Sequence, residues 1–285
     1  MKKRLISVAV ALVLLAAVIA WIDTLFMNAV LTAIGAIAMF EVLRAYNLHK
    51  NLLLDIAYIA FVSVTVFFEL FGGDGFLVAT VLLIFAIFSI AMFNKKQKHT
   101  VSQIGASFLA AFVIALGFSA MLYLRTMTPY VGDHRIMLIL ALALGWICDT
   151  CAFFAGKAFG KEKLCYEISP NKTVAGAIGG IVGTPIFAVA LLCVYSLLDK
   201  ATVFGGFSKD LGEIVFVAAM AMIGAAVGII GDLSASYIKR ECGIKDFGNL
   251  MPGHGGAMDR VDSVLFTSAY AALAFNLFFR IFVNI

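Results

Sequence analysis

The side chains best suited to chemistry gather in one stretch of the chain, between Gly231 and Ser263. This stretch begins where one apolar segment ends and finishes where the next one starts. Ionisable groups beside apolar segments are costly unless they are paired, hydrated or metal-bound, so a dense block of them is poorly explained as a passive loop. We interpret the stretch as a candidate active site. Its ionisable residues are Asp232, Lys239, Arg240, Glu241, Lys245, Asp246, His254, Asp259, Arg260 and Asp262.

Three carboxylates in this stretch are spaced to meet. Asp232 lies near the end of an apolar segment, and the spacing places Ser236 and Lys239 on the same helical face. Asp259 and Asp262 are three residues apart at the start of the last apolar segment, so they also share a face. If the two helix ends converge, the acids form an oxygen-rich site of the kind that suits Mg²⁺ and substrate phosphates. The alternative is a set of salt bridges at the membrane interface.

A glycine-rich turn, Pro252-Gly253-His254-Gly255-Gly256, directly precedes the segment that carries Asp259 and Arg260. Glycines allow the backbone to approach a ligand closely, and a helix N-terminus favours phosphate. His254, Gly255 and Gly256 are therefore candidate substrate contacts. His254 could equally be an ordinary loop residue.

A second group of polar residues lies upstream and is a candidate second wall of the site. Asp149 sits inside an apolar segment and is a candidate nucleotide or metal contact. Ser169 and Lys172 follow in a short polar stretch and are candidate phosphate contacts. Glu41 and Arg44, three residues apart at a helix end, are interpreted as a local ion pair.

The elements that position these residues are expected to be membrane helices. The chain of 285 residues is 63% hydrophobic and only 13% charged, whereas soluble proteins carry about 25% charge. Its mean hydropathy is +1.03. A membrane helix needs about 20 apolar residues, which predicts an all-α polytopic protein with about nine spans. The predicted spans are 5–22, 26–46, 52–71, 76–93, 102–124, 135–156, 174–198, 212–238 and 263–283.

Charge distribution predicts how these spans are oriented. We interpret the first span as a retained helix, since no convincing cleavage site follows it. With the N-terminus in the cytoplasm, 16 of the 21 Lys and Arg residues fall on the cytoplasmic side, which predicts an N-in, C-out topology and a cytoplasmic active site. Residues 1–100 are interpreted as scaffold helices and residues 101–285 as the catalytic region. Basic stretches of the kind that bind nucleic acid are absent from the sequence.

The stretch resembles the signature of the CDP-diacylglycerol synthases, also called phosphatidate cytidylyltransferases. The spacing is intact over 27 residues, and upstream Asp232, Asp149 and the Ser169 to Thr173 run also fit. The first half of the chain matches only in being apolar. The residues of the signature are Ser236, Lys239-Arg240, Lys245-Asp246, Gly248, Pro252, His254-Gly255-Gly256, Asp259-Arg260 and Asp262.

The resemblance implies a function in phospholipid biosynthesis: CTP and phosphatidate give CDP-diacylglycerol and pyrophosphate. It implies a homodimer in the inner membrane and a two-metal site with Mg²⁺, whose second ion could be monovalent. The implied metal ligands are Asp232, Asp259 and Asp262. The implied catalytic residues are Asp232, Lys239, Asp259, Arg260 and Asp262. The implied substrate contacts are Asp149, Ser169, Lys172, Ser236, Arg240, Lys245, Asp246, His254, Gly255 and Gly256.

Some positions depart from the family pattern, and other functions stay open. Asn171 and Ala175 stand where relatives often carry Lys and Glu, so we assign no acid role there; Ala257 replaces a bulkier apolar residue. The alternatives are another CTP-dependent lipid enzyme, such as a polyprenol kinase or an archaeal ether-lipid cytidylyltransferase, and a cation or metabolite transporter. Against transport, the acids gather at one surface, and no paired Gly/Pro breaks mark two matching halves.

Overall fold

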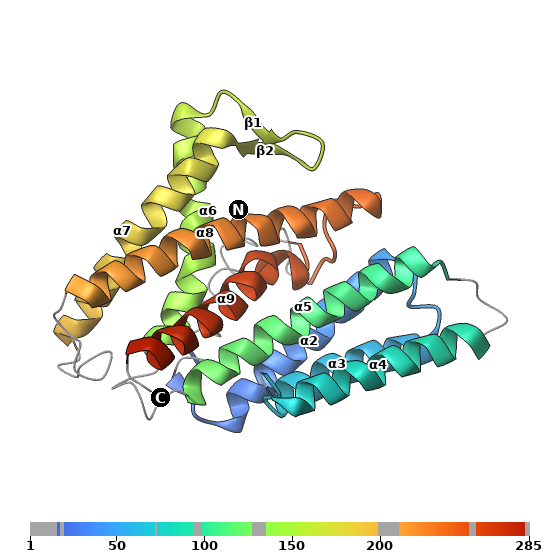
Figure 1. The fold of residues 1–285 in the computed structure, drawn as a ribbon. Coiled ribbons are helices and arrows are strands. Elements are labelled where there is room, and N and C mark those ends of the chain that lie inside the picture. Colours follow the sequence, from blue (N-terminus) through green and yellow to red (C-terminus); the bar gives the residue numbers. More distant parts are fainter. Residues whose placement is uncertain are drawn as a thin grey trace. The chain divides into compact units, whose positions relative to one another are not determined.

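The computed structural model of the chain is helical (Figure 1). It describes residues 16–17, 20–71, 73–93, 99–126, 135–198, 211–250 and 255–282. Its helices are α2 (Leu25–Ala45), α3 (Leu52–Phe67), α4 (Asp74–Phe93), α5 (Val101–Thr126), α6 (Arg135–Phe159), α7 (Val174–Leu198), α8 (Leu211–Glu241) and α9 (Met258–Phe282). Its strands are β1 (Lys163–Cys165) and β2 (Ser169–Thr173).

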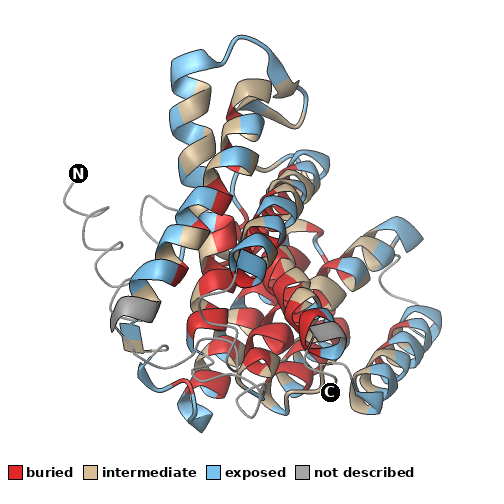
Figure 2. Cartoon of the chain, turned by 60° about the vertical axis from the view of Figure 1, so that its left-hand side comes forward, coloured by how far each residue is buried: buried red, intermediate tan, exposed pale blue. Residues whose placement is uncertain are grey.

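Seven helices in the described part of the chain are long and apolar enough to cross a membrane, all except α3. Figure 2 shows exposed residues along these helices. Many large apolar residues are among the exposed ones, which is more apolar surface than soluble proteins usually expose to water. The expected polytopic membrane architecture is therefore confirmed. The number of nine spans and the N-in, C-out topology stay predictions: α3 has 16 residues, and the predicted span 5–22 lies mostly outside the described residues.

The chain divides into two compact units, and both α8 and α9 contribute to each. The first unit combines residues 1–122 with 238–261, and the second combines 123–237 with 262–285. Residues 238–261, late in the sequence, therefore fold onto the N-terminal helices. The functional division proposed between residues 100 and 101 stays a prediction.

Small residues and polar anchors hold the N-terminal helices of the first unit together. A Cβ atom on Gly35 would lie 3.1 Å from Val62 and 3.3 Å from Phe118, so the missing side chain brings α2 close to α3 and α5. The Tyr58 hydroxyl donates to the Ile104 carbonyl at 2.9 Å and ties α3 to α5. Lipid tails are as apolar as these side chains, so burial of apolar surface does not drive membrane helices together. Close packing and hydrogen bonds between helices therefore contribute more to their association.

Glycines hold α6 against α7 in the second unit. A Cβ atom on Gly176 would lie 2.8 Å from the Ala152 carbonyl oxygen, and one on Gly180 would lie 2.8 Å from the Cys148 sulfur. Because these neighbours belong to α6, the glycines of α7 form the face that packs against α6. Cys148 is a buried free cysteine, as expected for a small apolar residue.

The loop between α6 and α7 forms a β-hairpin, which the all-α prediction missed. Strands β1 and β2 pair antiparallel, with Lys163 opposite Thr173 and Cys165 opposite Ser169. The segment reads as a loop because β2 contains Pro170 and Asn171, which are depleted in strands. A two-stranded hairpin has free edges on both sides, where proline is tolerated.

The helices that carry the predicted acids are longer than expected. Helix α8 continues to Glu241 rather than ending at residue 238, and α9 begins at Met258 rather than 263. Asp259 and Asp262 therefore lie within the first turns of a regular helix.

Candidate active site

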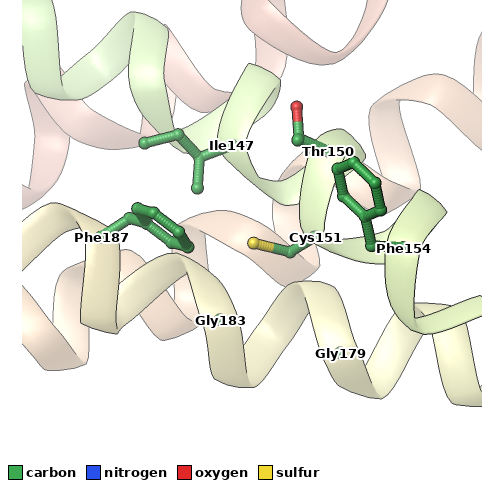
Figure 3. A pocket seen from close by; sticks show the side chains of 7 residues that line it. All are labelled: Ile147, Thr150, Cys151, Phe154, Gly179, Gly183 and Phe187. Carbon is green, nitrogen blue, oxygen red and sulfur yellow. The ribbon is translucent and has the colours of Figure 1, made fainter.

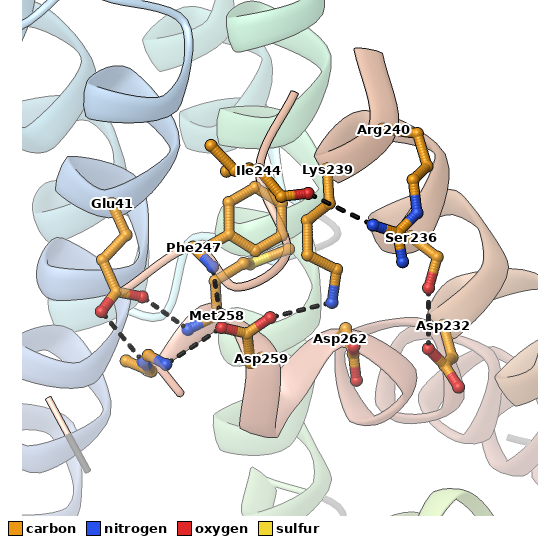
Figure 4. Close-up of polar contacts among 12 residues, drawn as sticks. Glu41, Asp232, Ser236, Lys239, Arg240, Ile244, Phe247, Met258, Asp259 and Asp262 are labelled. Carbon is orange, nitrogen blue, oxygen red and sulfur yellow. Dashed lines mark hydrogen bonds and ion pairs between the residues drawn. The ribbon is translucent and has the colours of Figure 1, made fainter. Parts of the chain in front are cut away.

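Asp259 is the most firmly held acid of the predicted site, and all its described partners lie in the first unit. Lys239 donates to its Oδ1 at 2.8 Å, while the backbone N–H groups of Phe247 and Gly256 donate to its Oδ2 at 2.8 and 3.0 Å (Figure 4). The side chains of Lys239 and Asp259 are only 11% and 3% exposed. The two predicted residues therefore form a buried ion pair, which hydrogen bonds from the backbone complete.

A glycine permits this arrangement of the loop before α9. Gly255 has a φ of +83°, and a Cβ atom there would lie 2.9 Å from Asp259 Oδ2. A side chain at this position would be strained and would crowd the carboxylate. The role of Gly255 in the structure is therefore to shape the turn around Asp259, while its predicted contact with substrate stays a prediction.

The sequence interpretation of Glu41 and Arg44 as a local ion pair missed their hydrogen-bond partners. Glu41 accepts hydrogen bonds from the backbone N–H groups of Ala257 and Met258 at 3.1 and 2.9 Å, and Arg44 donates to the Phe247 carbonyl at 3.0 Å. Both side chains therefore bind the segment that leads into α9. One sequence signal could have revealed Glu41: an acid inside an apolar helix needs a specific partner.

Tyr46, which directly follows α2, extends this contact to the end of α8. Its hydroxyl donates to Glu241 at 3.3 Å, and the Gln103 amide donates to its carbonyl at 3.2 Å. Burial raises the pKa of the Tyr46 phenol, and the neighbouring Cys242 and Glu241 raise it further. The phenol is therefore protonated near neutral pH and able to donate.

Three helices of the second unit meet closely near other predicted residues. A Cβ atom on Gly145 of α6 would lie 3.1 Å from the Ser263 hydroxyl, and one on Gly228 of α8 would lie 3.0 Å from Thr267 of α9. One on Gly231 would lie 3.0 Å from the Asp262 carbonyl oxygen. The glycines thus bring α6, α8 and α9 together, with Asp262 at the meeting point.

Asp232, which directly follows Gly231, is held more loosely than Asp259. Lys172 of β2 lies 2.5 Å from its Oδ2, and the Ser236 hydroxyl donates to its Oδ1 at 3.4 Å. The side chains of Lys172 and Asp232 are 23% and 22% exposed. The structure therefore joins two parts of the predicted site, the hairpin and α8, through an accessible ion pair.

The remaining acids of this region belong to the same three helices. The Ser263 hydroxyl donates to Asp149 Oδ2 at 3.5 Å, and the Ser263 N–H donates to Asp262 Oδ1 at 2.8 Å. Ser263 thus connects an acid on α6 with one on α9. The predicted grouping of Asp149 with the later acids has structural support inside this unit, whereas the convergence of Asp232 with Asp259 stays a prediction.

The other predicted residues are mostly exposed at the surface. Arg240 donates to the Ile244 carbonyl at 3.5 Å, and Ser169 lies half-buried at the start of β2. His254 lies outside the described residues. Their contacts with substrate stay predictions. The exposed side chains are those of Arg240, Lys245, Asp246 and Arg260.

The Asp232 carboxylate is chemically suited to bind Mg²⁺. In the described ranges, however, no three His, Cys, Asp or Glu side chains are grouped so that they could hold an ion. The Asp232 carboxylate already faces a cation, the Lys172 ammonium group, and carboxylate oxygens are ligands that Mg²⁺ prefers. Asp259 fits less well, because backbone donors engage its Oδ2 and only Oδ1, shared with Lys239, could contribute.

An apolar hollow of about 390 Å³ lies between α6 and α7 (Figure 3). Gly179 and Gly183 line it where α7 packs against Ala155 and Cys151 of α6, and the Thr150 hydroxyl donates to the Trp146 carbonyl rather than into the hollow. The hollow can therefore accept an apolar chain. Its lining residues are Ile147, Thr150, Cys151, Phe154, Gly179, Gly183 and Phe187.

Comparison with known proteins relates this architecture to one family. Residues 2–278 match the cytidylyltransferase family. The chain is 30% identical over 284 residues to a phosphatidate cytidylyltransferase of Bacillus subtilis (strain 168), covering 98% of both chains. It is 33% identical over 201 residues to one of Haemophilus influenzae, covering 70% of this chain and 65% of that one. It is 34% identical over 184 residues to one of Staphylococcus aureus (strain COL), covering 65% and 64%.

Proposed function

Because this chain belongs to the cytidylyltransferase family, we propose that it transfers CMP from CTP to phosphatidate, giving CDP-diacylglycerol and pyrophosphate for phospholipid biosynthesis. The observation that carries the proposal is similarity over nearly the whole length of the Bacillus subtilis phosphatidate cytidylyltransferase. This similarity favours CMP transfer over the kinase and transporter alternatives.

The reaction needs two phosphates brought together in line. A phosphatidate oxygen attacks the α-phosphorus of CTP, a new P–O bond forms, and the bond to the bridging oxygen of pyrophosphate breaks. Positioning and charge stabilisation dominate such transfers. We assign the leaving pyrophosphate to Lys239, Arg240 and Arg260. Lys172, the partner of Asp232, is assigned to a substrate phosphate.

We propose that Asp232 and Asp262 hold Mg²⁺, with Asp259 contributing through Oδ1 alone. When bound, the ion neutralises phosphate charge, and a second ion of the site could be monovalent. Lys172, the ion-pair partner of Asp232, would then be available to a substrate phosphate. Ser236 continues to orient Asp232 through its hydroxyl.

The lipid substrate explains why the enzyme is built from membrane helices. We propose that the hollow between α6 and α7 receives an acyl chain, because its lining is apolar. The site faces the cytoplasm, where CTP is present, and the protein forms a homodimer in the inner membrane. The asymmetric distribution of Lys and Arg supports this orientation.

The test is an assay of purified protein with phosphatidate and CTP that is labelled in either the cytidine or the γ-phosphate. Cytidine label should enter the lipid in a Mg²⁺-dependent manner, and γ-label should leave as pyrophosphate. A CTP-dependent lipid kinase would place the γ-label in the lipid instead. A transporter would label no lipid with either substrate, and both outcomes would overturn the proposal.

A further inference from the structure

The end of α2 contacts three successive points of the connection between α8 and α9. Tyr46 binds Glu241, where α8 ends, and Arg44 binds the Phe247 carbonyl in the middle. Glu41 binds the backbone where α9 begins. All these residues belong to the first unit, although about 200 positions of sequence separate the partners. Helix α2 of the N-terminal half therefore also holds the connection between α8 and α9 in place.

Glu41 caps α9 from another helix. The first N–H groups of a helix have no partner within it, and Glu41 accepts from two backbone N–H groups there, those of Ala257 and Met258. The side chain is 5% exposed. A buried carboxylate bound in this way fixes the position of the helix end, because moving the helix would leave a buried charge without partners.

Two glycines permit the connection to lie directly on this carboxylate. A Cβ atom added to Gly248 or to Gly256 would overlap the Glu41 carboxylate, so any larger residue would displace the backbone or the acid. The close approach has a consequence for the candidate site. Gly256 also donates its N–H to Asp259, and Phe247, next to Gly248, donates the second backbone hydrogen bond (Figure 4).

We propose that Glu41, assisted by Arg44, is a positioning residue of the enzyme: it fixes the backbone donors that orient Asp259 and, through Asp259, Lys239. The inference rests on the proposed function, because it assigns a catalytic consequence to the contacts. A purely structural anchor would affect the amount of folded protein, whereas a positioning residue affects turnover by the folded protein.

The first test compares Glu41→Gln with Asp55→Asn in purified protein. The amide keeps the shape of the side chain but directs an NH₂ group at one of the two N–H donors. We expect kcat to fall about 10- to 100-fold, with the KM for phosphatidate near the parental value. Asp55 is a matched control, an acid of α3 that is 9% exposed and whose described contacts do not reach the connection. Its amide variant should keep the parental kcat.

A double-mutant cycle tests the geometry. Gly248→Ala alone should reduce kcat strongly, since its methyl group overlaps the acid. In a Glu41→Ala background the methyl group has space, so adding Gly248→Ala should cost much less. Fully multiplicative losses would show that the two residues act independently and would overturn the inference.

Two further measurements keep the inference testable if Glu41→Gln does not fold. Arg44 is exposed, so Arg44→Met should fold, and its kcat should fall. Hydrogen exchange of residues 247–258 should also be faster in either folded variant, whatever the reaction. Parental kcat and parental exchange in a folded variant would overturn the positioning role. An inactive parent whose variants exchange faster would instead overturn the proposed function alone.

Discussion

Asp259 and Asp232 are both acids of the signature stretch, but their surroundings differ. Asp259 is 3% exposed in its side chain and accepts from one lysine and two backbone N–H groups. Asp232 is 22% exposed, and its partners are a lysine on a hairpin strand and a serine one turn away. A fixed acid and an accessible acid thus occur in one sequence motif.

Two acids of one motif can therefore have different roles. Breaking the buried pair would leave an uncompensated charge, which is strongly destabilising. Breaking the accessible pair leaves groups that water can reach, so its energetic cost is small. We therefore assign Asp259 mainly to organising the loop and Lys239, and Asp232 mainly to an exchangeable cation.

The largest expected effect is that of Asp259→Asn. The change leaves the buried Lys239 ammonium without its counter-charge, which should lower the free energy of unfolding by about 3–5 kcal/mol and abolish CMP transfer. Thermal unfolding in detergent and the labelled-CTP assay measure the two effects. Asp74→Asn, an exposed acid of α4, is the control and should change neither. Robust label transfer by Asp259→Asn would remove Asp259 from the site.

Asp232→Asn should separate activity from stability. CMP transfer should fall about 100-fold or more, because the proposed cation loses a ligand, while the free energy of unfolding changes by about 1 kcal/mol or less. The same two assays apply. If Asp232→Asn destabilises the protein as much as Asp259→Asn does, the contrast between the two acids is wrong.

Lys172→Met should have a smaller effect, limited to the binding of substrate. The variant removes a charged partner for phosphate, so the KM for CTP should rise about 10-fold with little change in stability. Lys161→Met, an exposed lysine just before the same hairpin, is the matched control. Equal KM values for the two variants would indicate that Lys172 only neutralises Asp232.

The last pair of variants concerns stability alone, through the packing beneath the hairpin. A methyl group at Gly176 would lie 2.8 Å from the Ala152 carbonyl oxygen and 3.0 Å from Thr173 Oγ1, next to Lys172. Gly176→Ala should therefore lower stability by about 1–3 kcal/mol. Gly105→Ala in α5 meets nothing within 4 Å and should raise stability by up to about 1 kcal/mol. Unfolding midpoints of the two variants check the contrast.

Local sequence patterns predicted much of this molecule. Apolar runs located the seven long helices. Charge in an apolar chain drew attention to Asp232, Lys239 and Asp259, and the structure pairs Lys239 with Asp259, whereas the convergence of the carboxylates stays a prediction. The start of α9 was placed five residues late, because its first turn is polar and hydropathy alone excludes it.

Contacts between distant segments were beyond such patterns. Glu41 and Arg44 read as a local pair because their spacing permits one, while their partners lie about 200 residues away. Lys172 was expected to contact substrate, and the structure pairs it with Asp232. This pairing depends on a hairpin that was not predicted, because Pro170 and Asn171 are unusual in strands. In both cases the tertiary structure determines the partner, which local sequence spacing does not predict.

A structure of the protein with CTP, and with Mn²⁺ in place of Mg²⁺, tests the proposed site most directly. We expect an ion bonded to an Asp232 oxygen, with CTP phosphates between that ion and Lys239, and Asp259 still held by Phe247 and Gly256. An ion bound away from Asp232 would contradict this expectation. So would a structure in which Asp232 and Lys239 contact different ligands.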